Sequence, residues 1–373
     1  MKILMYELKK IISGRFIKML ITGTFLLMAY INIFGTRGTD YKYDEYTGTL
    51  QLITGWNTVK LYKEETDKLV GVISEEDFEK YVKGYNAILD NPDNYKGDIT
   101  GNINDLKPEI RYGILHGYTP ILPYIQAAAP EGVKIRTLKE IIPDAVNCEF
   151  GQTEIWAELL KSLNGSGGII LSILVITSTS IIFAGEKETK TDQLIYMSKE
   201  NSKVNIIKIA ASFLFTSILY LIYLIINFGS RFLIWGKGDV NIAIQMNRYF
   251  IDYEASITFL QLMAMAMAVF WLGLFMLTSI VLFISSACPS KYTAIIISFI
   301  LVVVSYIPSV LMPPGIIHWT LYLPTSLLRP LTYFVSKERF TLLFPIVIAG
   351  CAVTFFMTLI CVLYTRFKKL GKG

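Results

Sequence analysis

The sequence predicts an all-α polytopic membrane protein with six transmembrane helices and both termini in the cytoplasm. A mainly helical or α+β extracellular domain is expected between the first and second of these helices. Of the 373 residues 53% are hydrophobic and 17% charged, and the mean hydropathy is +0.47, which is too apolar for a typical soluble domain. Several apolar runs approach or exceed the roughly 20 residues that cross about 30 Å of hydrocarbon. Basic residues also gather in three clusters that can share one side of the membrane.

The predicted spans are helical because lipid offers backbone polar groups no partner. Residues 1–15 precede the spans and mix charged with apolar residues. This mixture indicates an amphipathic helix on the inner membrane surface, with its apolar side chains toward lipid: Ile3, Leu4, Leu8, Ile11 and Ile12. The six spans are residues 16–34, 168–184, 206–228, 257–285, 293–312 and 343–364.

Lysine and arginine set the orientation, because cytoplasmic flanks carry an excess of both. They cluster before the first span, around the second loop and after the sixth span: Lys2, Lys9, Lys10, Arg15 and Lys18; Lys187, Lys190, Lys199, Lys203 and Lys208; Arg366, Lys368, Lys369 and Lys372. Residues 36–164 hold 14 basic and 21 acidic residues, against 21 and 9 in the rest of the chain. The net charge of +5 therefore reflects membrane orientation, and nucleic-acid binding has little support.

Residues 36–164 are predicted to form the extracellular domain. Ser74 and Asp77 make a capping box, and apolar residues then recur at helical spacing until Asn91-Pro92. A second helix is expected over 154–163, followed by a hinge or capping segment at 164–168, while 91–150 has no clear pattern. The helix that begins after Ser74 carries the aromatic residues Phe78, Tyr81 and Tyr85. The domain's aromatic candidates for binding a peptide are Tyr41, Tyr43, Tyr46 and Trp56.

Residues 165–373 hold the other five spans, a cytoplasmic loop at 185–203 and a proline-broken apolar segment at 313–340. Four prolines exclude one continuous helix in that segment. We expect it to re-enter the outer leaflet, with Trp319, Tyr322 and Tyr333 at headgroup level, and an ordinary external loop is the alternative.

The chemistry that the chain lacks is also informative. His116 and His318 have no His or Cys neighbour at metal-ligand spacing, and Gly236-Lys237 lacks the remainder of a phosphate-binding loop. The four cysteines offer no disulfide framework within the extracellular domain. No ionisable residue occupies the middle of a predicted span, which disfavours a proton-coupled carrier. We therefore expect no enzyme, no metal and no cofactor in this chain, and an external energy source.

The loop GEKETKTDQLIYMSKENSK, residues 185–203, carries a short apolar patch of Leu194, Ile195 and Met197 after a charged run. Such a pattern is typical of a short interfacial helix, although a solvated loop would read similarly. Together with the start YELKKIISGRFIKMLI, the insert after the first span and the segment FAGEKETKTDQLIYMSKENSKVNIIKI, it resembles the type 2 permeases of ATP-binding cassette (ABC) exporters, the type V exporters.

This resemblance implies a coupling helix at 186–198 that fits a groove on a separate ABC ATPase. The chain departs from the family at Lys190, where glycine is common, and lacks a proline a few residues later. The implied partners are two copies of that ATPase, which would bind ATP and Mg, a second permease chain, identical or homologous, and membrane lipid. The implied contact residues are Glu186, Lys187, Glu188, Thr191, Asp192, Leu194 and Ile195.

The function implied is export of a hydrophobic or amphipathic substrate, such as an antimicrobial peptide, drug or lipid, across a bacterial plasma membrane. Met263, Met267, Thr177 and Thr179 are candidates to line the path, although such residues more often serve plain helix packing. The alternative function is a membrane-anchored sensor or immunity or scaffold protein whose extracellular domain binds a peptide or partner. Its acidic, aromatic composition suits a cationic peptide.

Overall fold

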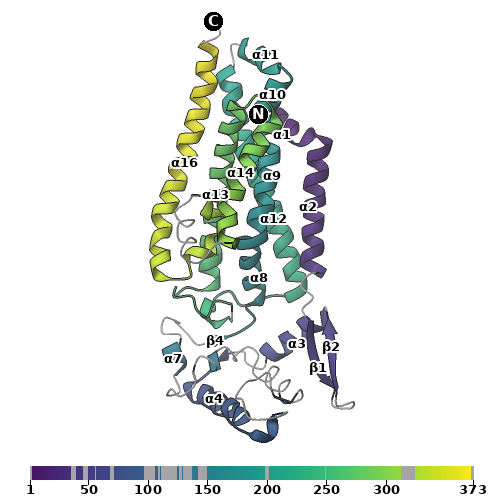
Figure 1. Ribbon diagram of the computed structural model, residues 1–373, viewed down its shortest axis with the longest axis vertical. Coiled ribbons are helices and arrows are strands. Elements are labelled where there is room, and N and C mark those ends of the chain that lie inside the picture. Colours follow the sequence, from purple (N-terminus) through teal and green to yellow (C-terminus); the bar gives the residue numbers. More distant parts are fainter. Residues whose placement is uncertain are drawn as a thin grey trace. The chain divides into compact units, whose positions relative to one another are not determined.

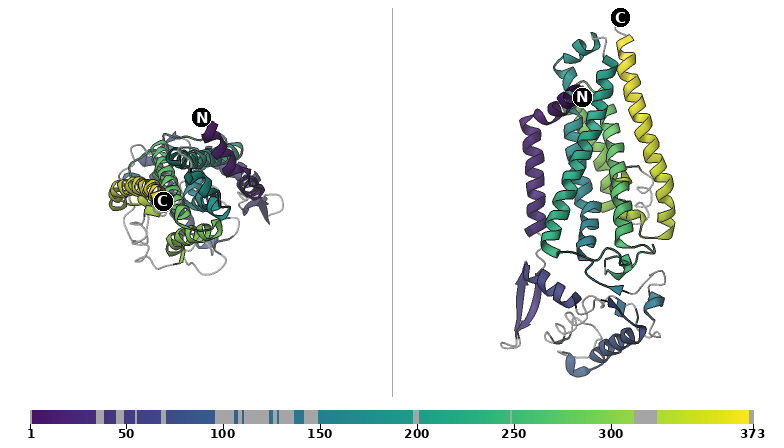
Figure 2. Two further views of the ribbon diagram at one scale, coloured as in Figure 1. Left: turned by 90° about the horizontal axis from the view of Figure 1, so that it is seen from above. Right: turned by 180° about the vertical axis from the view of Figure 1, so that it is seen from behind.

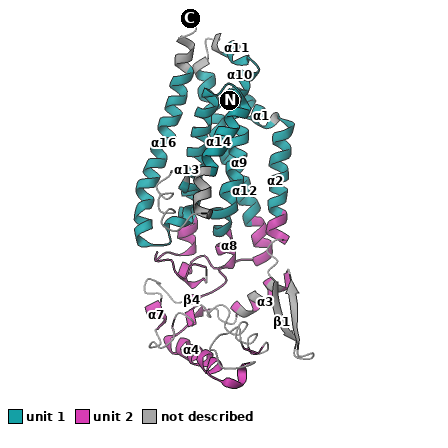
Figure 3. Cartoon of the chain, in the orientation of Figure 1, with its two compact units in different colours: residues 1–29, 160–228, 264–373 teal, residues 30–159, 229–263 magenta. Residues whose placement is uncertain are grey.

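In the computed structural model the chain forms two compact units, coloured separately in Figure 3. Unit 1 comprises residues 1–29, 160–228 and 264–373, and unit 2 comprises residues 30–159 and 229–263. The structure describes residues 2–34, 39–44, 49–54, 56–67, 71–95, 106–107, 110, 124–125, 128, 137–141, 149–197, 201–247, 249–311 and 324–370.

Unit 1 is a bundle of long apolar helices (Figure 1). Several helices continue from unit 1 into unit 2. Within the part of the chain that the structure describes, five stretches are long and apolar enough to cross a membrane: Arg15–Phe34, Glu154–Glu188, Lys203–Trp235, Phe259–Ala287 and Lys337–Thr365. Its helices are α1 (Lys2–Ser13), α2 (Arg15–Phe34), α9 (Gly168–Thr179), α10 (Ile181–Glu188), α11 (Thr191–Met197), α12 (Asn201–Trp235), α13 (Phe259–Ala287), α14 (Lys291–Leu311) and α16 (Lys337–Leu370).

These helices confirm the predicted all-α membrane character. The fifth predicted span, residues 293–312, lies in α14, of which the stretch Lys291–Val303 counts only as a shorter apolar helix, so six crossings stay a prediction. In Figures 1 and 2, α16 and the unit 1 part of α2 lie on opposite sides of the bundle. Only 17% and 22% of their apolar windows are buried, as expected for helices that face lipid.

The second predicted span begins much earlier than expected. Helix α8 (Glu154–Ser162) continues through a π-helical turn, Leu163–Gly167, into α9, so the glycine-rich segment 164–168 does not end the helix as predicted. Packing explains this result. A Cβ at Gly167 would lie 2.1 Å from the Tyr223 hydroxyl oxygen, so the glycine admits a close approach by α12. Asn164 Oδ1 also accepts a hydrogen bond from Leu331 N at 2.9 Å.

The apolar face of α1 is divided. Leu8 and Ile11 are buried, while Ile3 and Ile12 are exposed. The prediction that all of the apolar residues face lipid is therefore wrong for Leu8 and Ile11, which pack within the protein.

The described part of the segment 313–340 contains two short 3-10 turns, η5 (Pro324–Leu328) and η6 (Pro330–Tyr333), and then the start of α16. Tyr333 is fully buried within the protein, and its predicted place at headgroup level stays a prediction. Leu327 is also buried, and a Cβ at Gly350 of α16 would lie 2.5 Å from its Cδ1. Trp319 and Tyr322 lie outside the described residues, and the choice between a re-entrant segment and a loop stays open.

Unit 2 has α+β content. Strands β1 (Thr39–Asp44) and β2 (Thr49–Thr54) pair antiparallel, with Thr39 opposite Thr54, and β3 (Gly71–Val72) pairs with β4 (Glu149–Phe150). Its other elements are α3 (Trp56–Asp67), α4 (Glu75–Leu89), η1 (Pro92–Asn94), α7 (Leu138–Ile141) and η4 (Ile244–Met246). The predicted cap is confirmed: Ser74 Oγ accepts a hydrogen bond from Asp77 N at 3.1 Å.

The core of unit 2 contains a segment that sequence analysis did not assign to it. Phe78, Val82 and Tyr85 of α4 are buried in one cluster with Ile242 and Met246, which lie between α12 and α13. The Tyr124 hydroxyl donates to Gln245 O at 2.5 Å, which also joins the segment between α12 and α13 to this unit. The compact unit is therefore discontinuous in sequence, whereas the prediction took 36–164 alone.

Candidate coupling site in unit 1

Segments far apart in the sequence meet at one end of unit 1. They are α1, the α10–α11 turn, the start of α12, the junction between α13 and α14, and the end of α16 (Figure 1). A shallow cleft there is lined by residues from α10 to α16, including Asp192, Asn205 and Thr365. The sequence predicts a cytoplasmic location for every one of these segments.

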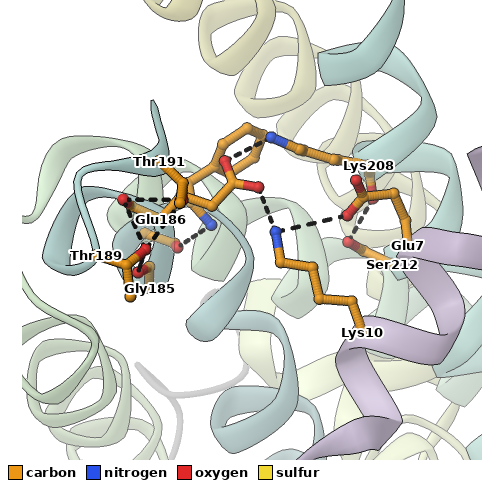
Figure 4. Close-up of polar contacts among 10 residues, drawn as sticks. Glu7, Lys10, Gly185, Glu186, Thr189, Thr191, Lys208 and Ser212 are labelled. Carbon is orange, nitrogen blue, oxygen red and sulfur yellow. Dashed lines mark hydrogen bonds and ion pairs between the residues drawn. The ribbon is translucent and has the colours of Figure 1, made fainter. Parts of the chain in front are cut away.

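Glu186 is the centre of this site (Figure 4). Lys208 Nζ of α12 donates to Glu186 Oε2 at 2.5 Å, and Lys10 Nζ of α1 donates to Glu186 Oε1. The Glu186 and Lys208 side chains are 4% and 1% exposed, whereas Lys10 is 36% exposed. One buried carboxylate therefore ties α10 to both α1 and α12, and its two charge-assisted bonds are of the strong kind.

A second carboxylate completes the charge balance. Glu7 Oε2 lies 4.0 Å from Lys10 Nζ, and the Glu7 side chain is 7% exposed. Burial raises the pKa of Glu7, although Lys10 and Lys208 pull that pKa down. With both glutamates ionised, the four side chains sum to zero charge, which is how buried charges are usually tolerated.

The turn between α10 and α11 has a left-handed residue at its centre. Lys190 has φ +59°, a conformation that glycine adopts freely and that costs other residues about 1–2 kcal/mol. This is the position at which the family resembled often has glycine. The Thr189 hydroxyl donates to Gly185 O at 3.1 Å and lies 2.9 Å from the Thr191 hydroxyl oxygen, so side-chain hydrogen bonds fasten the turn.

Two further lysines bind the last turn of α10 to its neighbours. Lys187 Nζ donates to Ser286 O and, at 2.9 Å, to Cys288 O, which satisfies carbonyls where α13 ends. Lys291 Nζ lies 3.5 Å from Glu188 Oε1 across a half-exposed pair. Helix α10 is thus tied at one end to four other segments.

The seven predicted coupling residues fall into three groups by exposure. Glu186 is buried at the base, Lys187, Asp192 and Ile195 are half-buried, and Glu188, Thr191 and Leu194 are exposed. Leu194 of α11 is 71% exposed. The contact with an ATPase stays a prediction, and in this structure the exposed group alone is fully open to a partner.

The predicted path residues have local roles. The Thr177 and Thr179 hydroxyls donate to Ile173 O and Val175 O of their own helix, at 2.8 and 2.6 Å. Met263 is buried and belongs to unit 2, while Met267 is half-buried in unit 1. Path lining by these four residues remains a prediction.

Sequence analysis missed Glu7 as a member of the site, as well as an ion pair in unit 2. Arg231 Nη1 of α12 lies 2.8 Å from Glu158 Oε2 of α8, and the two side chains are 9% and 20% exposed. The sequence does carry a signal for Glu7, because it is an acidic residue next to the apolar Leu8 in an otherwise basic helix. Arg231 was not, because the predicted span ended before it.

Among the residues that the structure describes, no group of His, Cys, Asp and Glu could hold a metal ion. His116 and His318 lie outside that part of the chain. Comparison of the whole sequence and structure with protein-family models, with curated proteins and with solved structures found no match.

Proposed function

We propose that this chain is the permease subunit of an ABC exporter, driven by a separate ATPase that presses on α11. One observation carries the proposal: α11 is a seven-residue helix with an exposed apolar side chain, and it directly follows the last turn of α10. Hydrogen bonds and ion pairs join that turn to α1, α12, α13 and α14. A force applied to α11 would therefore reach several helices at once.

The base, the last turn of α10, is suited to transmit force because its central ion pair, Glu186 with Lys208, is buried. Pulling Lys208 away from Glu186 would leave a buried ammonium without its nearest counter-charge and without water, a penalty of several kcal/mol. Helix α10 and the start of α12 should therefore move together. The solvated pair of Lys291 and Glu188 is weaker and can yield.

The proposed exporter has two permease chains, identical or related, and two ATPase chains that bind ATP and Mg. The cargo is hydrophobic or amphipathic, such as a peptide, drug or lipid, because the central parts of the spans carry no ionisable residue. The chain itself has no enzymatic role in this scheme, and the bacterial plasma membrane is its expected location.

The test is association with an ABC ATPase, sought first among the products of the neighbouring genes. Leu194→Asp should abolish co-purification of the two proteins and stimulation of ATP hydrolysis, because a charge cannot enter an apolar pocket. Gln193→Asp is the matched control, because Gln193 is also exposed and lies next to Leu194 but carries no apolar side chain. Leu221→Asp would be a poor control, because Leu221 is exposed on an apolar helix. Equal association of both variants, or a wild-type chain that captures no ATPase, would refute the proposal.

The alternative, a sensor or scaffold, is favoured by the independent core of unit 2. Deletion of 36–164 alone is a poor test, because it would expose Ile242 and Met246, which are buried in that core. Binding of a cationic peptide to the full chain in nanodiscs lacking ATPase is the sharper measurement. Saturable binding, together with retained signalling in Leu194→Asp, would support a sensor over an exporter.

A further inference from the structure

The long helix that runs from α8 to α10 is interrupted at Ser180, between α9 and α10. In a continuous α-helix Ala184 N would donate to Ser180 O, four residues earlier. Here the hydroxyl of Ser285, on α13, takes part in that link. Ala184 N donates to Ser285 Oγ at 3.0 Å, and Ser285 Oγ donates to Ser180 O at 2.7 Å. Phe183 N also donates to Ser285 Oγ, at 3.2 Å.

We propose that Ser285 is a positioning residue that holds an interruption in this helix, and that a shift between the interrupted and a continuous helix is the motion that α11 relays. The second half rests on the proposed function; the first half does not. A side chain inserted into the hydrogen-bond ladder is a known cause of helix bending. All three groups joined by Ser285 are buried, so water is no ready substitute.

The hydroxyl run before Ser180 softens the same stretch. The Ser178 and Thr179 hydroxyls donate to carbonyls four residues earlier, at 2.5 and 2.6 Å, and Thr177 does the same. Such back-bonding weakens and often bends helices. Ser180 Oγ is itself buried with no hydrogen-bond partner. This hydroxyl is therefore a group that a rearrangement of the stretch could satisfy.

A continuous helix would satisfy the same groups in another way. Ala184 N would bond directly to Ser180 O, and Ser285 Oγ could bond to the carbonyl four residues earlier in α13, as buried serines commonly do. The Ser180 hydroxyl could likewise donate to the carbonyl oxygen four residues earlier in its own helix. The interrupted and the continuous helix therefore both give the backbone groups a hydrogen-bond partner. Since neither leaves a buried donor unpaired, a small force on α10 can select between them.

The expected displacement follows from the length of α10. Its eight residues span about 12 Å, and loss of a bend of about 20° moves its end by about 4 Å. We would measure this with spin labels on exposed Gln193 of α11 and exposed Tyr364 of α16, in the full chain without its native cysteines, in nanodiscs.

Ser285→Ala should shift the distance between the two labels by about 4 Å, the displacement of the α10 end, and Ser285→Thr, which keeps the hydroxyl, should restore the original distance. Ser279→Ala is the matched control: Ser279 is equally buried on α13 and donates only within that helix, to Met276 O. Identical distances in all four proteins would overturn the proposal. If Ser285→Ala fails to fold, a Ser285→Val variant, which has the shape of Ser285→Thr without the hydroxyl, should show the shift, and an unchanged distance there would overturn the proposal.

The relay is tested separately with ATPase and nucleotide present. Nucleotide should move the wild-type distance toward that of Ser285→Ala. A chain that binds no ATPase would defeat the proposed function while the label distances still decide the role of Ser285. A bound ATPase that moves α11 without changing this distance would defeat the relay alone.

Discussion

Replacing Glu186 by glutamine removes the charged acceptor that Lys10 and Lys208 share. Lys10 is 36% exposed and can turn to water, but Lys208 is 1% exposed and stays buried. Removing one partner of a buried pair costs about 3–5 kcal/mol. Because ionised Glu7 still interacts with Lys208, we expect the lower end, a loss of about 3 kcal/mol in the free energy of unfolding.

The assay is reversible denaturant unfolding of the full chain in micelles, followed by tryptophan fluorescence. The matched control is Glu188→Gln, two residues away, whose half-exposed pair with Lys291 should be worth about 0–1 kcal/mol. The double variant Glu186→Gln, Lys208→Met should recover much of the loss, because it removes the stranded charge and fills its space with an apolar side chain. A double variant less stable than Glu186→Gln alone, or a Glu186→Gln effect no larger than the control, would refute the buried network.

Three further outcomes are expected. Gly167→Ala should lower the free energy of unfolding by about 1–3 kcal/mol, since its Cβ would collide with the Tyr223 hydroxyl, whereas Gly165→Ala, with nothing within 4 Å, should be neutral or stabilising in the same denaturant assay. Because burial raises the pKa of Glu7, the folded protein holds that proton more tightly than the unfolded chain; this stabilisation is present at low pH and is lost as pH rises through the raised pKa. Glu7→Gln should therefore flatten the fall in stability between acidic and neutral pH, which unfolding titrations at several pH values can check. Ile242→Ala should destabilise unit 2 by about 2–5 kcal/mol, detected as faster hydrogen exchange in α4, and unchanged exchange would contradict the shared core.

Local signals in the sequence predicted the parts of the fold that local physics decides. The length of the apolar runs predicted the long helices, because a backbone in lipid can satisfy its hydrogen bonds only within a helix. Ser74 and Asp77 gave the start of α4, since a cap forms between residues three apart in the chain. The short α11 lies within the residues of the predicted coupling helix, because its apolar patch follows a tight polar turn.

Long-range packing decided the rest. The glycine-rich stretch at 164–168 has the composition of a helix end, but it lies within a helix because Tyr223 packs on Gly167. Nothing near Ile242 in the sequence indicates that it shares a core with α4. The buried state of Glu186 likewise depends on Lys208, 22 positions later, and on Lys10, 176 positions earlier.

The contacts within unit 1 also bear on the number of membrane crossings. Lys187 bonds to Ser286 O and Cys288 O, so the end of α13 lies at the same end of the unit as Glu186, and Thr365 near the end of α16 lines the same cleft. If α13 and α16 both cross the membrane, the chain must cross once more between residues 288 and 337 to bring Thr365 back to that end. Helix α14 has 21 residues, about 31 Å, and is long enough to do so. We therefore expect Glu338→Cys to react with a membrane-impermeant thiol reagent on intact cells and Gln193→Cys to react only after permeabilisation; labelling of both from outside would contradict six crossings.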